Sequence, residues 1–112
     1  MEEFSVKSER NNGVAVVTVT GRVDSVTAAT LDSELAKIAH HDKKIVLDLF
    51  EVAYMSSAGV RAIVKALQGA TKSGGGLKLA AVPRHVMDVL ETVGMLQLLE
   101  IYPAAEDAAE SF

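Results

Sequence analysis

The short run 45–50, with the sequence IVLDLF, is the feature that most constrains what this chain can fold into. All of its residues except Asp48 are apolar, and the run is too short for a typical helix. Such a run is typical of a strand that is covered on both faces, as in a parallel sheet. Segments with the helical spacing of apolar residues flank it at about 26–39 and 58–73. This alternation predicts an α/β fold with right-handed crossovers.

The N-terminal segment predicts a hairpin. Residues 4–9 alternate in polarity, and the run 14–20 (VAVVTVT) is rich in β-branched residues. Asn11-Asn12-Gly13 lies between them and favours a tight turn, so the first two strands should pair antiparallel. Gly21 is expected to end the second strand.

The C-terminal half continues the alternation. Gly74-Gly75-Gly76 should stop the preceding helix. We do not interpret these glycines as a phosphate loop, because the Gly-Lys-Ser/Thr ending of such a loop is absent. Strands are predicted at 77–82 and 98–102, with helices that begin at Pro83 and Pro103. The order ββαβαβαβα predicts a mixed, mostly parallel sheet of about five strands with helices packed against it. We expect residues 1–112 to form a single domain.

Composition and charge argue against several classes of function. The net charge is −4 and no basic cluster exceeds a lysine pair, so nucleic acid is not expected as a direct partner. The chain contains no cysteine, and His40-His41 lies at a predicted helix end, where cations suit the dipole. We therefore expect no metal site and no cofactor. The N-terminus lacks a signal-peptide pattern, and no apolar run could span a bilayer, so a cytoplasmic protein is expected.

The predicted topology brings a few polar residues to one edge of the sheet. Sites in open α/β sheets gather where the parallel strands end, an edge that we call the rim. Asp24 follows the strand at 14–20, Ser56 and Ser57 follow the strand at 45–50, and Arg84 follows the strand at 77–82. We therefore expect Asp24 to lie near the two serines.

The residues themselves leave two interpretations of Ser56 and Ser57. Serine is a favoured N-cap, worth about 1 kcal/mol over alanine, and Gly59 would let another loop approach the helix closely. Alternatively, a helix N-terminus favours a phosphate group, which adds about −1.5 to −2 charges. A phosphate at this position would barely disturb the fold, but near Asp24 it would repel a partner. The residues alone favour capping.

Enzyme interpretations fit the sequence less well. A serine hydrolase needs a base, an orienting acid and an oxyanion hole, but the G-x-S-x-G motif is absent and only His85 could lie near the rim. A receiver-like phosphorylation site at Asp48 would need an acidic pair after the early strand and a lysine after the last strand. The sequence has neither at these positions. We expect Asp48 to accept hydrogen bonds from loop backbone instead. The sequence favours a protein that binds proteins.

The order of elements and four motifs together resemble the STAS-domain anti-sigma factor antagonists over essentially the whole chain. The strongest match is 45–64 (IVLDLFEVAYMSSAGVRAIV), which is similar to the family's strand followed by a D-S-S-G-L-type loop. Gly21-Arg22-Val23-Asp24 is similar to the family's Gly-x-Leu/Val-Asp segment. The segments 74–81 and 93–96 also follow the family pattern.

This resemblance implies a protein switch. In the family, the unphosphorylated antagonist binds an anti-sigma factor, usually one with a serine kinase domain, and releases the sigma factor. Phosphorylation of the first serine of D-S-S-G abolishes binding, and a serine phosphatase restores it. The motif falls on Ser56-Ser57-Ala58-Gly59, which implies Ser57 as the acceptor, with Ser56 as the alternative because it replaces the family's aspartate.

The resemblance also implies a partner surface. Asp24 matches a family aspartate beside the phosphorylation site, and we expect Asp24, Ser56, Ser57, Gly59 and Arg61 to contact the partner. The alternative function is a STAS domain without a switch, acting as a scaffold or subunit of a stress-sensing or lipid-transport complex.

Overall fold

A tight turn at Asn12-Gly13 forms the N-terminal hairpin in the computed structural model, which describes residues 3–112. Both turn residues have positive φ, 54° and 80°, as a two-residue hairpin turn with asparagine and glycine requires. The turn pairs β1 (Ser5–Asn11) with β2 (Val14–Val23) antiparallel. The predicted hairpin is confirmed.

The other strands join this hairpin in parallel and in chain order. The sheet order is β1-β2-β3-β4-β5, with β3 at Lys44–Met55, β4 at Gly76–Ala80 and β5 at Ile101–Tyr102. The helices are α1 (Ser25–His41), α2 (Ser57–Lys72), α3 (Arg84–Thr92) and α4 (Ala105–Glu110), with a 3₁₀ turn at Leu96–Leu98. The predicted α/β fold with a mixed, mostly parallel sheet is confirmed.

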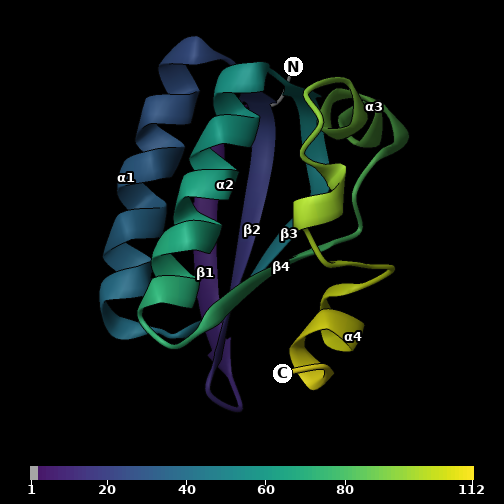
Figure 1. Ribbon diagram of the computed structural model, residues 1–112. Helices are drawn as coiled ribbons and strands as arrows, with labels where there is room; N and C mark the ends of the chain where they lie inside the picture. Colours follow the sequence, from purple (N-terminus) through teal and green to yellow (C-terminus); the bar gives the residue numbers. More distant parts are fainter. Residues whose placement is uncertain (1–2) are drawn as a thin grey trace.

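The two faces of the sheet are covered unequally. Helices α1 and α2 lie side by side over one face (Figure 1), where they bury the larger hydrophobic core. Leu31 and Leu35 of α1 and Ile63 of α2 contribute to it, each at most 1% exposed. Helix α4 packs on the opposite face, where Ala108 joins Val46 and other small residues in a second, smaller core.

A buried lysine holds α4 against the sheet. Lys78 of β4 is 8% exposed, and its Nζ donates to the Ser111 hydroxyl at 2.6 Å and to the Ser111 carbonyl oxygen at 3.1 Å. The Nζ also lies 4.4 Å from the centre of the Phe112 ring. These contacts satisfy a charge that would otherwise be costly to bury, and they tie the C-terminal residues to the sheet.

The prediction that Gly21 ends the second strand is wrong. Gly21 lies inside β2 with φ of 93°, next to a register shift in its pairing with β3. A Cβ there would lie 2.8 Å from the carbonyl oxygen of Glu3, so the glycine is needed for a close approach of the N-terminal backbone. The strand continues for two more residues because β3 also continues and pairs with it, as in Val23↔Met55.

Other strand boundaries also differ from the prediction. Strand β3 runs five residues beyond position 50, so the expected loop before Ser56 is strand. The predicted final strand, 98–102, is shortened to Ile101–Tyr102, because Leu98 belongs to a 3₁₀ turn and the next two residues form no regular element. Strand β4 ends at Ala80, and Pro83 is the N-cap of α3, one residue before the helix. The last helix begins two residues after Pro103.

Candidate functional site

The rim is built from the ends of β2 and β3, which stay paired beyond the end of β4. Val23 and Met55 are the last paired residues of the two strands. The backbone N–H of Ser56 then donates to the carbonyl oxygen of Val23 at 2.8 Å. The next residues of each chain segment, Asp24 and Ser56, cap α1 and α2. The predicted proximity of Asp24 and the serines is therefore confirmed, and both helices start at this edge, at the top of Figure 1.

Asp24 is held by its own helix. Its Oδ1 accepts hydrogen bonds from the backbone N–H groups of Val26 at 3.0 Å and Thr27 at 2.9 Å, and the Thr27 hydroxyl accepts from the Asp24 N–H. This capping box lowers the pKa of Asp24 below its ordinary value, chiefly through the Thr27 N–H. The rim therefore carries a fixed negative charge at neutral pH.

The two serines have different roles in the first turn of α2. Ser56 is the N-cap, half-buried, and its Oγ accepts a hydrogen bond from the Gly59 N–H at 3.2 Å. Ser57 is the first helical residue and is exposed. Its hydroxyl has no hydrogen-bond partner among residues 3–112. The sequence did not separate capping from chemistry, whereas the structure assigns capping to Ser56.

Gly59 is part of the packing beneath the rim. The residue is buried, and a Cβ there would lie 2.6 Å from Cγ1 of Val23 and closer still to Sδ of Met55. The expected close approach at Gly59 is present, but the approaching element is the end of β2 and not a loop. Gly59 is buried in the chain, and its contact with a partner stays a prediction.

Ser57 borders two shallow hollows. The first, of about 410 Å³, has an apolar floor of Val60, Val64, Val93 and Met95, with Arg61 on its edge. The second, of about 330 Å³, lies between Ser57 and α3. The contribution of the segment after α3 to the first hollow was missed by the sequence reasoning, although the match at 93–96 was a signal for it.

The sequence analysis did not identify the residues of α3 that face the second hollow. Asp88, Val89 and Thr92 border it, one to two turns after Arg84, which was expected to share the rim. The side chain of Arg84 is 93% exposed and pairs with Asp88 at 3.6 Å.

The basic side chains around the rim are mostly engaged. Lys65 of α2 pairs with Asp32 of α1 at 3.1 Å, and Arg22 stacks over the ring of Tyr54 at 4.3 Å from its centre. The guanidinium of Arg61 is the exception, because it has no hydrogen-bond or ion-pair partner in the described part of the chain. Arg61 is exposed and also borders a groove between α1 and α2.

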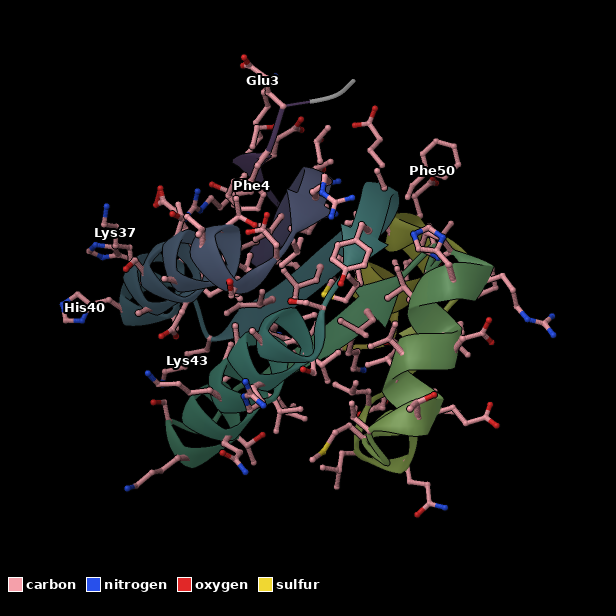
Figure 2. The ribbon with its side chains drawn as sticks, turned by 90° about the horizontal axis from the view of Figure 1, so that it is seen from above. Glu3, Phe4, Lys37, His40, Lys43 and Phe50 are labelled. Atoms are coloured by element: carbon pink, nitrogen blue, oxygen red, sulfur yellow. The ribbon has the colours of Figure 1, made fainter. Side chains whose placement is uncertain are left out.

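Phe50 adds an exposed apolar side chain on the other face of the sheet. It is 74% exposed. In Figure 2, which looks down on the rim, it points outward on the far side of the sheet from α1 and α2. Asp48, on the same strand, accepts a hydrogen bond from the Phe50 N–H at 3.1 Å. The carboxylate therefore bonds to backbone as expected, but within a strand and not to a loop.

Metal clusters and membrane-spanning helices were both looked for within residues 3–112. No group of three or more His, Cys, Asp or Glu side chains in this range is placed to hold a metal ion. Within the same range, no helix combines the length and the apolar character needed to cross a bilayer. His85, considered as a base near the rim, is exposed at the start of α3.

Comparisons with known proteins agree with this geometry. The STAS domain family model matches residues 5–108. The chain is 30% identical over 105 residues to BtrV of Bordetella bronchiseptica, covering 93% of this chain and 90% of that protein. It is 24% identical to the anti-sigma-B factor antagonist of Bacillus subtilis, covering 96% and 98% of the two chains.

A solved structure matches over nearly the same length. The crystal structure of an anti-sigma factor antagonist from Mycobacterium paratuberculosis superposes with a TM-score of 0.86 and is 25% identical, covering 97% of this chain and 93% of that one. The elements that form the rim thus lie within both the sequence and the structural match. The chain belongs to the STAS domain family.

Proposed function

We propose that this chain is an anti-sigma factor antagonist whose unphosphorylated form binds an anti-sigma factor and so releases a sigma factor. The observation that carries the proposal is the match along nearly the whole chain, in sequence and in structure, to proteins named as such antagonists. Residues 1–112 would act as one binding domain and not as an enzyme. The exposed rim around Asp24, Ser57 and Arg61 would be the docking surface.

Ser57 is the proposed phosphoacceptor. A kinase must take the hydroxyl into its own active site, and Ser57 is exposed with an unengaged hydroxyl. Ser56 is half-buried and already accepts a hydrogen bond as the N-cap. The serine kinase domain of the anti-sigma factor would transfer the γ-phosphoryl group of ATP to Oγ of Ser57, which loses its proton, and ADP would leave. A serine phosphatase would hydrolyse the ester and restore the hydroxyl.

The phosphate would change binding more than folding. At the first helical position, the N–H groups and the helix dipole favour an anion by about 0.3–1 kcal/mol, so α2 should stay intact. The group adds about −1.5 to −2 charges beside the ionised Asp24. A partner surface that fits the unphosphorylated rim would then meet added negative charge, at a cost of several kcal/mol.

Phosphate mapping tests the proposal. Candidate anti-sigma factors with kinase domains are incubated with the protein and ATP, and the phosphorylated residue is located by mass spectrometry. The wild type and the Ser56→Ala variant should be labelled on Ser57, whereas Ser57→Ala should lose the label and still bind. Ser57→Glu should bind more weakly.

Two results would contradict the proposal in different ways. If Ser57→Ala is labelled as strongly as the wild type, the acceptor is wrong. If the protein binds a kinase-bearing anti-sigma factor but is never phosphorylated, the chain is a scaffold STAS domain without a switch.

A further inference from the structure

Ser57 and Arg61 face the same hollow from one helix. They are residues i and i+4 of α2, both are exposed, and both border the hollow whose floor is Val60, Val64, Val93 and Met95. Side chains at this spacing are neighbours on a helix, and an acidic group that precedes a basic one is the more favourable order. A phosphate on Ser57 would therefore lie within reach of Arg61.

The other basic groups near Ser57 are already engaged. Lys65 is paired with Asp32, Arg84 with Asp88, and Arg22 lies over Tyr54. Arg61 alone among these four cations has no such partner within residues 3–112.

Guanidinium chemistry suits this role. A guanidinium group binds phosphate through two parallel hydrogen bonds, which a lysine ammonium cannot reproduce. The acidic side chains of the neighbouring elements, Asp24 at the start of α1 and Asp88 on α3, would both disfavour a phosphate dianion. Arg61 is placed to offset them.

We infer that Arg61 responds to phosphorylation of Ser57 by forming an ion pair with the phosphate, so that the pair lies within one helix, α2. The inference rests on the proposed function for its choice of Ser57. In the unphosphorylated protein Arg61 is free at the edge of the hollow and available to a carboxylate of the partner. Once Ser57 is phosphorylated, the same guanidinium is drawn onto the phosphate. The switch then removes a cation from the docking surface in addition to placing an anion there.

The test uses the full chain with phosphoserine incorporated at position 57 during synthesis, so that neither a kinase nor a partner is needed. The second pKa of the phosphoserine is measured by ³¹P NMR titration. An ion pair with Arg61 stabilises the dianion, so Arg61→Gln should raise this pKa by about 0.2–0.4. Arg61→Lys should recover part of the shift, because it restores the charge but not the paired hydrogen bonds.

The matched control is Lys72→Gln, which removes an exposed positive charge from the last turn of the same helix. It should leave the phosphoserine pKa unchanged. The inference is overturned if Arg61→Gln has no effect, or if Lys72→Gln shifts the pKa equally. The result is separable from the proposed function, because a phosphate placed at Ser57 reports on Arg61 whether or not a kinase modifies that serine.

Discussion

Replacing Gly59 by alanine should destabilise the protein because this glycine lets α2 begin directly against the end of β2. A Cβ at Gly59 would lie 2.6 Å from Cγ1 of Val23, whereas carbon atoms in favourable contact are about 3.5–4.0 Å apart. The Met55 side chain on the other side of the site is flexible and can shift. Val23 is β-branched, buried and held in the sheet, so the overlap with Val23 must be relieved by moving the helix.

The expected size of the effect combines two opposing terms. Forcing an extra carbon into a packed core costs about 1–3 kcal/mol. Replacing a helical glycine by alanine gains up to about 1 kcal/mol from helix propensity. With the full propensity gain subtracted, we expect Gly59→Ala to lower the free energy of unfolding by up to about 2 kcal/mol.

The same helix offers a matched control. Gly69 is exposed in α2, and a Cβ there would meet nothing within 4 Å. Gly69→Ala should therefore raise the free energy of unfolding by about 0.5–1 kcal/mol from propensity alone. Urea unfolding followed by circular dichroism measures both variants, and the m-value checks that the unfolding transition is unchanged.

A Val23→Ala background tests the cause. If the overlap with Val23 is responsible, Gly59→Ala should cost clearly less in this background than in the wild type. Equal stability of Gly59→Ala and Gly69→Ala, or a cost of Gly59→Ala that the change at Val23 does not alter, would show that the overlap with Val23 is not responsible.

Three further predictions address the rim and the C-terminal helix. Native hydrogen bonds, chiefly from the Thr27 N–H, lower the pKa of Asp24 below 3.8, so its ionised carboxylate should stabilise the fold above that pH. This contribution should be lost as the pH falls toward the lower native pKa, and Asp24→Asn should flatten that part of the Tm–pH curve. Ser56→Ala removes the N-cap and should lower the free energy of urea unfolding by about 1 kcal/mol, whereas an unchanged midpoint would contradict the capping role. Lys78→Met removes the hydrogen bonds to Ser111, so amide hydrogen exchange in 105–110 should accelerate about tenfold, with unchanged exchange arguing against the anchor.

The sequence was sufficient for features that depend on local chemistry or on topology. Asn12-Gly13 predicted the hairpin because a tight turn needs two residues with positive φ. The spacing of apolar residues located α1 and α2 to within two residues at most of their ends. The rule that parallel strands end at one edge predicted from the sequence that Asp24 and Ser56 lie close together.

The features that the sequence did not predict depend on contacts between distant segments. From the neighbouring residues alone, Gly21 was predicted to end the strand. The approach of the Glu3 backbone and the pairing with β3 keep it inside the strand. The division of roles between Ser56 and Ser57 required knowing at which residue α2 begins. The sequence did not show that Lys65 would pair with Asp32 while Arg61 has no ion-pair partner among residues 3–112.

The most direct test of the account is the affinity of the protein for its anti-sigma factor in the two states of Ser57. Isothermal titration calorimetry would compare the unphosphorylated chain with the chain that carries phosphoserine at position 57, using the anti-sigma factor identified by the labelling experiment. We expect phosphorylation to weaken binding by roughly 100-fold or more, which corresponds to a loss of about 3 kcal/mol. Equal affinities in the two states would contradict the proposal that Ser57 is the switch.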